Sequence, residues 1–345
     1  MHSKRKILLV EGRNIGDAVI STGVIESLGG SFPDDEIYVL TRPQFGAVFA
    51  GNPHIKNIFF AQFPMGTNKH FTPVDAYRLA RLLCQLRHAR FDMVINRMGD
   101  FREVLIGAFI SRHGNTTISW GADHPFSHLV WQQFHGLANC VEIPNDVINI
   151  YAAQNYFMQH LGCTKILPPH IKTQVARENI IGIHPFSGQL CRTWPYENWI
   201  VIVKYLRQKT PVRLFCAPEE AEMARAIFKD ILAYPDVSLC ACPADVFFEN
   251  LASCRLLIGL DSFSIHAAYA LGVPGIRLNG ANDSKIWLPP GFTNVSAASG
   301  CGSQPCFNKP QCRLMPNNYY ACMNAITPKM VIDCIENLKT DENNK

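Results

Sequence analysis

The sequence has no long hydrophobic run, few charged residues and no block of basic residues. No stretch approaches the roughly 18 consecutive apolar residues of a membrane-spanning helix, so none is predicted. The formal net charge is +4 and lysine and arginine do not cluster, which argues against a nucleic-acid surface but allows an anionic partner or the inner membrane. "MHSKRKILLVEGR" begins like a signal peptide, yet its apolar run is short and no small-residue cleavage site follows. A cytoplasmic protein is expected, either free or peripheral to the inner membrane.

Two motifs of nucleotide-binding enzymes are also missing. The loop "EGRNIGD", which follows the first apolar run, is not a G-x-G-x-x-G sequence, so a dinucleotide in this half is not supported. No Asp-x-Asp motif stands in a suitable loop, so neither a catalytic metal nor another cofactor is expected.

Cysteine, in contrast, is abundant, with 13 residues. Nine lie in strand-like or helix-like segments, where cysteine usually packs as a small apolar residue. The other four lie near the C-terminus at a spacing looser than that of paired C-x-x-C zinc sites. They predict free structural thiols, a disulfide or a structural metal site, and they are Cys301, Cys306, Cys312 and Cys322.

Short apolar segments alternate with helical patterns through both halves of the chain. The clearest helix begins at "TPVDAYRLARLLCQLRHA", where Thr72 is the expected N-cap. The segment 163–178 contains proline, shows no period and is read as a linker. The pattern predicts an α/β fold with parallel sheets covered by helices on both faces. We expect two Rossmann-like domains, 1–165 and 166–345, that face a central cleft, with the last helix free to pack back on the first domain.

Ligands of such sheets bind at the carboxyl ends of the strands, which selects four loops. In "EGRNIGD", Asp17 is either a helix N-cap or a carboxylate that faces the cleft. In "HPFSGQLCRTWPYENW", Ser187 and Gly188 offer hydroxyl and backbone N–H groups, and the guanidinium of Arg192 suits phosphate oxygens. A plain surface arginine is the alternative reading.

The other two loops follow later strands. In "CAPEEAEMA", Glu219 or Glu222 could accept hydrogen bonds from ribose hydroxyls, or could simply suit the helix dipole. In "IGLDSFSIHAAYALG", an acid ends a strand and a helix N-terminus follows, which is a favourable place for a diphosphate. The histidine in that helix is either a packed core residue or part of the site. The candidates of this loop are Asp261, Ser262, Phe263, Ser264 and His266.

Taken in order, these loops resemble glycosyltransferase family 9, the bacterial ADP-heptose lipopolysaccharide heptosyltransferases and their relatives. "ILLVEGRNIGDAVISTGVIESL" resembles the opening strand, loop and helix of the family with its Gly-Asp pair. "IGIHPFSGQLCRTWPYENW" resembles the segment with a basic residue two positions before Trp-Pro. "IGLDSFSIHAAYALGVPGIRLNGAND" is similar to the family's D-[ST]-G-x-x-H motif. The resemblance covers nearly the whole chain, including the cysteine-bearing tail.

The resemblance implies a GT-B fold and an inverting, metal-independent transfer of a sugar, foremost a heptose from ADP-heptose, to a hydroxyl such as that of lipopolysaccharide core. Asp17 matches the general base, and Arg192 the basic residue that holds the donor diphosphate. Asp261 and the amides after it match donor contacts, and Glu222 the acid near the adenosine ribose. Arg102 resembles a basic residue on the side of an anionic glycan or glycolipid acceptor.

The first domain would then bind the acceptor and the second the nucleotide sugar. Phe263 and Phe186 stand where the family has small glycines, which questions the identity of the donor more than the reaction. Two alternatives remain at this point. One is a nucleotide-sugar epimerase or hydrolase on the same fold, and the other is a non-catalytic protein that binds nucleotide sugars.

Overall fold

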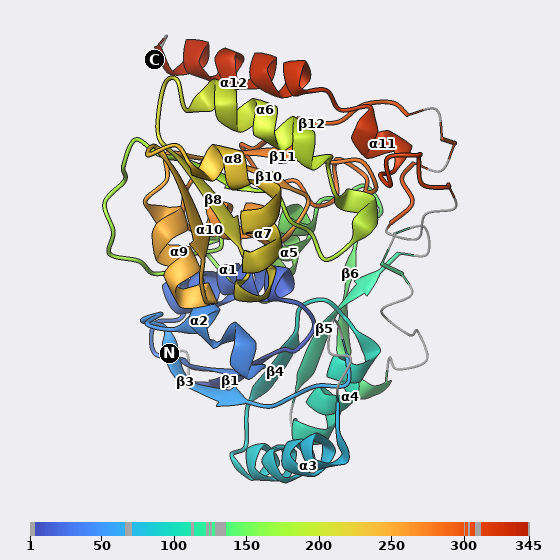
Figure 1. Cartoon of the computed structure of the whole chain (residues 1–345). Coiled ribbons are helices and arrows are strands. Elements are labelled where there is room, and N and C mark those ends of the chain that lie inside the picture. The colour runs from blue at the N-terminus through green and yellow to red at the C-terminus, as the bar shows by residue number, and fades with distance from the viewer. Residues whose placement is uncertain are drawn as a thin grey trace. The chain divides into compact units, whose positions relative to one another are not determined.

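The computed structural model describes residues 4–65, 71–111, 114–121, 124, 126–127, 136–299, 301–302, 304–307 and 312–343. It divides the chain into two compact units, Met1–Lys172 and Thr173–Lys345, and the division falls inside the segment predicted to be a linker. Each unit is one parallel sheet with helices on both faces (Figure 1). Within the described residues, no helix has the length and apolar character needed to cross a membrane.

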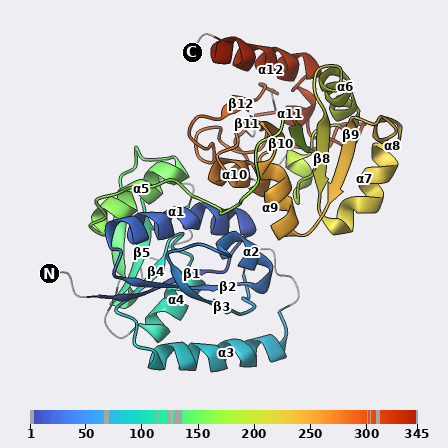
Figure 2. The same ribbon diagram turned by 90° about the vertical axis from the view of Figure 1, so that its left-hand side faces the viewer.

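The first unit contains six parallel strands in the order β3-β2-β1-β4-β5-β6. The strands are β1 (Lys6–Glu11), β2 (Glu36–Thr41), β3 (Ile55–Phe60), β4 (Met93–Asn96), β5 (Asn115–Trp120) and β6 (Asn139–Ile143). The helices are α1 (Ile15–Ser31), η1 (Pro43–Phe45), α2 (Gly46–Phe49), α3 (Pro73–His88), α4 (Phe101–Ile110) and α5 (Ile150–His160). Figure 2 shows α1 and α5 on one face of this sheet and α3 and α4 on the other.

The second unit repeats this plan with the order β12-β11-β10-β7-β8-β9. Its strands are β7 (Ile181–His184), β8 (Val212–Cys216), β9 (Val237–Ala241), β10 (Leu256–Leu260), β11 (Gly275–Leu278) and β12 (Thr293–Val295). Its helices are η3 (Leu190–Arg192), α6 (Tyr196–Leu206), η4 (Pro218–Glu220), α7 (Ala221–Ile227), α8 (Lys229–Leu232), α9 (Ala244–Ala252), α10 (Phe263–Ala270), α11 (Ala321–Asn324) and α12 (Pro328–Asn343). Helix α12 packs along α6 and against β12 of its own unit (Figure 1).

The central strands are apolar along their whole length because helices cover both faces of each sheet. Residues 7–10 of β1 and all of β10 are buried, as their unbroken apolar sequences predict. Helix α3 starts where the sequence predicts, since Thr72 and Asp75 exchange side-chain and backbone hydrogen bonds in a capping box. The α/β fold expected from the sequence is therefore confirmed.

In both sheets the first strand of the unit lies in the middle. The next two strands add on one side of it, and the last three strands add on the other side. The order reverses between β1 and β4 in the first unit and between β7 and β10 in the second. A crevice forms at such a switch point because the loops after the two strands leave in opposite directions. The loops after β1, β4, β7 and β10 are therefore the places where each unit is expected to bind its ligand.

Candidate active site

Asp17 lies in the first turn of α1, just beyond the end of β1. The helix begins at Ile15 with Asn14 as its N-cap residue, so the reading of Asp17 as the N-cap is wrong. The Asn14 side chain donates to Asp17 Oδ2 at 3.0 Å, and Asp17 is only 5% exposed. This bond fixes the direction of the carboxylate at the switch point of the first sheet.

Arg97, which follows β4, joins this carboxylate to a second acid. Its guanidinium is fully buried, and Nη2 lies 3.6 Å from Asp17 Oδ1 and 3.8 Å from Glu11 Oε2. Nη2 also donates to the Asp17 carbonyl at 3.1 Å, and Nε donates to Ser21 Oγ at 2.9 Å. Ser21 in turn donates to Glu11 Oε2. Arg97 is thus the one residue of this network that contacts all the others.

Two carboxyl groups beneath the loop are completely removed from solvent. Burial raises the pKa of Glu11 to about 7, with Arg97 opposing and Asp17 adding to the effect. Burial likewise raises the pKa of Glu103 well above its ordinary value, and the nearby Glu11 adds to it. Glu103 Oε1 accepts the backbone N–H of Gly12 at 2.8 Å, which anchors the loop to α4. Because a Cβ on Gly12 would come within 2.7 Å of the Phe63 ring, the loop requires glycine there.

Arg102 lies in the first turn of α4 and is held by the N-cap of that helix. Its Nε and Nη2 donate to the two oxygens of Asp100 at 2.9 and 2.7 Å, and Nη1 donates to the Pro64 carbonyl at 3.0 Å. Burial opposes ionisation of Asp100, but the bonds from Arg102 bring its pKa below the ordinary value. Arg102 therefore already has a paired, bidentate partner in the protein.

In the second unit the structure brings Arg192 and Asp261 together. Arg192 ends the short helix η3 after β7, and Asp261 follows β10 across the switch point. Arg192 Nη1 donates to the Asp261 carbonyl at 2.7 Å and lies 3.8 Å from its Oδ2. The Arg192 side chain is 22% exposed, so its guanidinium is fixed but still reaches solvent.

The carboxylate of Asp261 is engaged on both oxygens and is almost fully buried. Arg277 Nη1 donates to Oδ1 at 3.3 Å, and Asn282 Nδ2 donates to Oδ2 at 2.5 Å. Burial opposes its ionisation, but Arg277, Arg192 and Asn282 together hold the pKa of Asp261 below its ordinary value. Asp261 is therefore a charged anchor for Arg192.

Helix α10 starts directly after this anchor. Ser262 is its N-cap residue, and the Ser262 and Ser264 hydroxyls lie 2.9 Å apart. The Phe263 ring packs edge-on against His184 and lies 5.1 Å from the Phe247 ring. His266 is buried beside the Trp287 ring. The first backbone N–H groups of a helix have no partner within the helix, so this end suits an anion.

Ser187 and Gly188 line a polar hollow of about 450 Å³ on the loop after β7. Thr193, Tyr196 and Glu197 from the same segment line it as well, together with residues 317–319 of the tail. Phe186, next to Ser187, instead points into the core, where it packs against Tyr196 and Phe228.

The acids after β8 divide into a structural one and two exposed ones. Glu220 Oε2 accepts the backbone N–H of Ala217 at 2.9 Å and so closes the turn. Glu219 and Glu222 are exposed at the carboxyl end of β8. This is where the sequence predicts an acid beside a ribose.

A family model for glycosyltransferase family 9 (heptosyltransferase) matches residues 79–316, more than half of the chain. The chain belongs to glycosyltransferase family 9. It is therefore a glycosyltransferase of the heptosyltransferase family, as the resemblance in the sequence predicts.

Relatives of this family 9 glycosyltransferase share its fold at low sequence identity. Lipopolysaccharide heptosyltransferase 3 of Escherichia coli is 24% identical over 79% of this chain and 83% of its own. E. coli ADP-heptose LPS heptosyltransferase II has a TM-score of 0.71 at 17% identity, with 98% and 99% of the two chains covered. A family 9 glycosyltransferase of Veillonella parvula has a TM-score of 0.73 at 17% identity, covering 98% and 97%. These matches confirm the GT-B fold.

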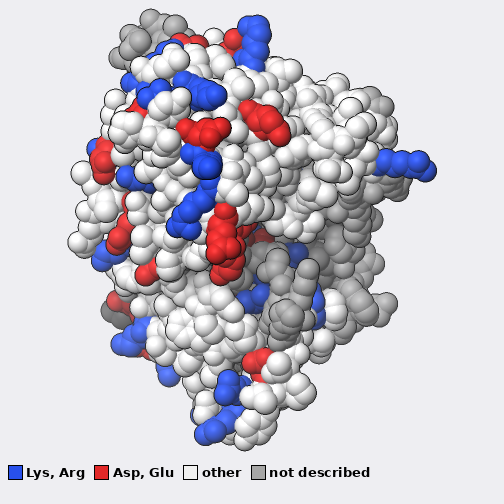
Figure 3. Space-filling view, in the orientation of Figure 1, with Lys and Arg blue, Asp and Glu red and all other residues white. Residues whose placement is uncertain are grey.

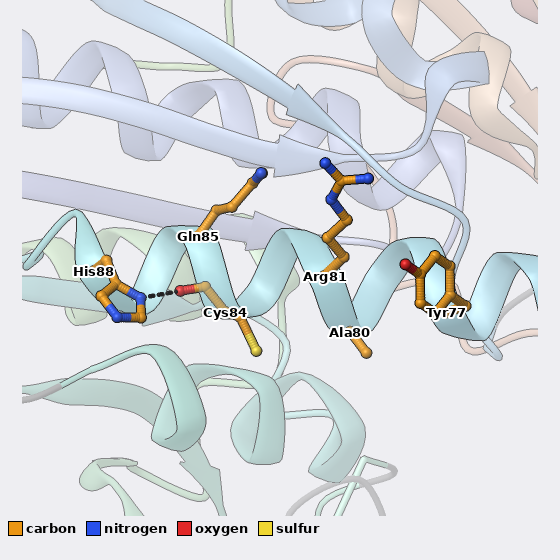
Figure 4. Close-up of a pocket in the computed structure, with 6 residues that line it drawn as sticks. All are labelled: Tyr77, Ala80, Arg81, Cys84, Gln85 and His88. Carbon is orange, nitrogen blue, oxygen red and sulfur yellow. Dashed lines mark hydrogen bonds between the residues drawn. The ribbon is translucent and has the colours of Figure 1, made fainter.

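The family 9 glycosyltransferase also carries a hollow of about 690 Å³ on α3. Figure 4 shows the side chains that line it along this one helix, with the His88 ring bonded to the Cys84 carbonyl at 2.7 Å. Lys and Arg side chains gather at the lower tip of the view in Figure 3, where α3 lies. Because all the residues that line this hollow come from one helix, it is a shallow depression of the surface and not a candidate ligand site.

All 13 cysteines of the family 9 glycosyltransferase are free thiols. Burial raises the pKa of Cys322 to about 11, and the nearby Cys301, Cys306 and Cys312 add to the effect. Cys191, beside Arg192, belongs to the same neighbourhood: burial raises its pKa first and Cys306 adds to the effect. Among the residues that the structure describes, no group of three or more His, Cys, Asp or Glu has a geometry that could hold a metal ion.

Sequence reasoning missed several charged residues of this family 9 site, three of which lie in or near the loop after β1. Arg13 stands inside the loop "EGRNIGD" itself, Glu11 ends β1, and Arg97 directly follows β4. The switch-point rule would have found Arg97, since its strand pairs with β1. No sequence signal shows that Glu11 points into the core rather than toward solvent.

Proposed function

We propose that this glycosyltransferase moves a heptose from ADP-heptose to a hydroxyl of an anionic acceptor such as lipopolysaccharide core, with inversion and without a catalytic metal. The names of its relatives support the substrates. The curated relatives are lipopolysaccharide heptosyltransferases, and E. coli heptosyltransferase WaaC has been solved with ADP-2-deoxy-2-fluoro heptose and with ADP. The observation that carries the proposal is the pair of fixed groups at the switch points, Asp17 in the first sheet and Arg192 in the second.

Asp17 is the proposed general base. Its carboxylate is held by Asn14 at Oδ2, while Oδ1 lies 3.6 Å from Arg97, too far for a hydrogen bond. Oδ1 would accept the proton of the acceptor hydroxyl as that oxygen attacks the anomeric carbon. The bond from the anomeric carbon to the diphosphate breaks in the same step, which inverts the configuration.

Arg192 and the first N–H groups of α10 are proposed to stabilise the negative charge of the departing diphosphate. A guanidinium presents a fork of donors that matches diphosphate oxygens, and a helix N-terminus adds a favourable dipole. Both are fixed before the reaction, Arg192 by Asp261 and the helix by its packing, so little reorganisation is needed as ADP leaves. Asp261 would act by positioning Arg192, and Glu219 or Glu222 would bind the ribose.

The test combines Asp17→Asn with a donor screen. We expect ADP release and acceptor glycosylation with ADP-heptose, unaffected by EDTA, and a smaller or no signal with GDP- and UDP-sugars. Asp17→Asn should keep its fold and its affinity for ADP but lose about 10²- to 10⁴-fold in transfer rate. Asp34→Asn, an exposed carboxylate of the same unit, is the matched control. Full turnover by Asp17→Asn would exclude it as the base, and transfer from UDP- or GDP-sugars alone would refute the donor.

A further inference from the structure

Four arginines surround the carboxyl ends of β1, β2 and β4, and three of them have firm partners. Arg97 is bonded to Ser21 and to the Asp17 carbonyl, and Arg102 is paired with Asp100. Arg42 Nη2 donates to the Met65 carbonyl. The fourth, Arg13, lies on the loop between the end of β1 and the start of α1.

Arg13 differs from these three in how little of its guanidinium is used. Nε lies 3.5 Å from Asp100 Oδ2, but Arg102 already bonds to both oxygens of that carboxylate. In the part of the chain that the structure describes, Arg13 has two buried nitrogens without a hydrogen-bond partner, Nε and Nη1, whereas Arg42 and Arg97 have one each. Leaving such donors unpaired costs folding free energy, so a protein that keeps them is expected to use them for a ligand. The side chain as a whole is 18% exposed, so a rotation of the guanidinium would bring its two buried nitrogens to a ligand.

The carboxyl groups near Arg13 keep its guanidinium charged although it is largely buried. Burial lowers the pKa of Arg13, and four carboxylates outweigh it, with Asp17 having the largest effect of the four. Two of the others, Glu11 and Glu103, are the fully buried acids whose pKa is raised by burial. Near neutral pH Glu11, with its pKa of about 7, is partly protonated, and Asp100 is already paired with Arg102.

We infer that Arg13 binds the carboxylate or phosphate of an anionic acceptor and thereby places the acceptor's hydroxyl at Asp17. This inference rests on the proposed function, since it deepens the acceptor half of that site. Arg13 and Asp17 are four residues apart on one short loop and helix start, so a single sugar can contact both. The planar guanidinium offers two parallel donors, which is the geometry that carboxylates and phosphates accept. Arg102, whose fork is already filled by Asp100, would support the site from below.

The experiment measures binding by the full chain without any donor. D-glucuronate and D-glucose 6-phosphate serve as a sugar carboxylate and a sugar phosphate, and D-glucose as the neutral control, each by calorimetry and thermal shift. We expect one or both anions to bind and glucose not to bind, and the stronger anion identifies the charged group. Arg13→Gln should weaken anion binding at least about tenfold and Arg13→Lys by less, because lysine keeps the charge but loses the fork.

Two control variants show where the anions bind. Arg81→Gln removes an exposed arginine of α3 and should leave anion binding unchanged. Arg192→Ala removes the cation proposed for the donor diphosphate and shows what share of the anion binding, if any, occurs there. Binding that disappears in Arg192→Ala but persists in Arg13→Gln would overturn the inference, as would a native chain that binds neither anion. Arg13→Lys keeps the positive charge beside the four carboxyl groups, so it also tests the inference if Arg13→Gln does not fold.

Failure of the inference and failure of the proposed function give different results. If ADP-heptose is not a donor but anion binding still depends on Arg13, the role of Arg13 in the acceptor site is supported and the proposed donor is refuted. If transfer from ADP-heptose occurs and Arg13→Gln leaves the acceptor KM unchanged, the reaction stands and the role of Arg13 is refuted.

Discussion

Asp17 and Arg192 each depend on a second charged residue for their position. Asp17 is held by Asn14 and faces the buried cation Arg97, whereas Arg192 is bonded to Asp261. Asp261 in turn is held by Arg277 and Asn282. At the residue scale, each proposed reactive group therefore rests on partners that are themselves buried and charged or polar.

Arg192→Ala should weaken ADP binding by about ten- to a hundredfold, which corresponds to losing about 1.5–3 kcal/mol of charge-assisted hydrogen bonding. Calorimetric titration with ADP measures it. Arg207→Ala, which removes a half-buried arginine paired with Asp236 in the same unit, is the control and should bind ADP normally. Equal affinities for ADP in the native chain and in Arg192→Ala would contradict a role in holding the diphosphate.

Glu11 should make the protein less stable as the pH rises from about 4.5 to about 7. Burial raises the pKa of Glu11 from 4.5 to about 7, so over this range the folded chain keeps a proton that the unfolded chain has lost. The free energy of unfolding then falls with rising pH and levels off above about 7. Glu11→Gln, which is uncharged at every pH, should lack this share of the fall.

Urea unfolding of both chains at pH 5, 6, 7 and 8 checks the prediction for Glu11. The difference between the two chains isolates this residue from Glu103 and from other groups that titrate in the range. A constant difference from pH 5 to pH 8 would mean that Glu11 titrates normally in the folded protein.

At the scale of elements, α3 is the helix that depends most on its own ends. Most of its residues are exposed, and Leu79 and Leu86 are the two residues of this helix that are buried. Much of its stability must therefore come from local interactions, of which the capping box at Thr72 is the clearest.

Thr72→Ala should cost about 1 kcal/mol, because it leaves the Asp75 backbone N–H without its cap. Hydrogen exchange of the α3 amides measures the loss, which should be confined to this helix and its contacts on α4. Thr72→Ser keeps the acceptor oxygen and should restore most of the protection. Equal exchange in all three chains would show that packing, not the cap, holds α3.

The sequence was sufficient for most elements and for the positions of the site loops. The strands "KILLV" and "LLIGL" are apolar throughout because they are buried on both faces, so their pattern is plain. The strands β5, "NTTISW", and β6, "NCVEI", were not predicted. Their polar residues resemble loop sequence, and Asn115 is buried only because it bonds to Asn96 and to backbone carbonyls.

The same limit applies to the site. Asp17, Arg192 and Asp261 could be selected because each follows a recognisable strand. The contacts of Arg97 with Ser21 and Glu11 join residues more than 70 positions apart, and no local pattern encodes them. The placement of Phe263 could not be foreseen either. Its ring packs toward His184 and Phe247, so a large residue at this position still has room in the core.

At the scale of the whole molecule, the two units are joined by a segment with little regular structure. Residues 174–179 are exposed, and 163–178 contains no strand or helix. Lys165 and Lys172 both lie there, but Ser31 Oγ bonds to the backbone N–H and carbonyl of Lys165.

Brief trypsin treatment should therefore cut after Lys172 before it cuts after Lys165. Mass spectrometry of the fragments identifies the order, and Lys172→Gln should remove the cut at this position while leaving one after the exposed Arg177. Earlier cleavage after Lys165 would show that its bonds to Ser31 do not protect the chain.

The bond between Arg192 and the Asp261 carbonyl has a consequence for the entropy of donor binding. A free arginine explores many rotamers and must give them up when it meets a ligand. Here folding has already restricted the guanidinium, so an incoming nucleotide meets a rigid receptor and loses less disorder on binding. Arg192→Lys would keep the positive charge but restore the conformational freedom of the side chain. Its affinity for nucleotide should therefore fall mainly through a less favourable entropy of binding.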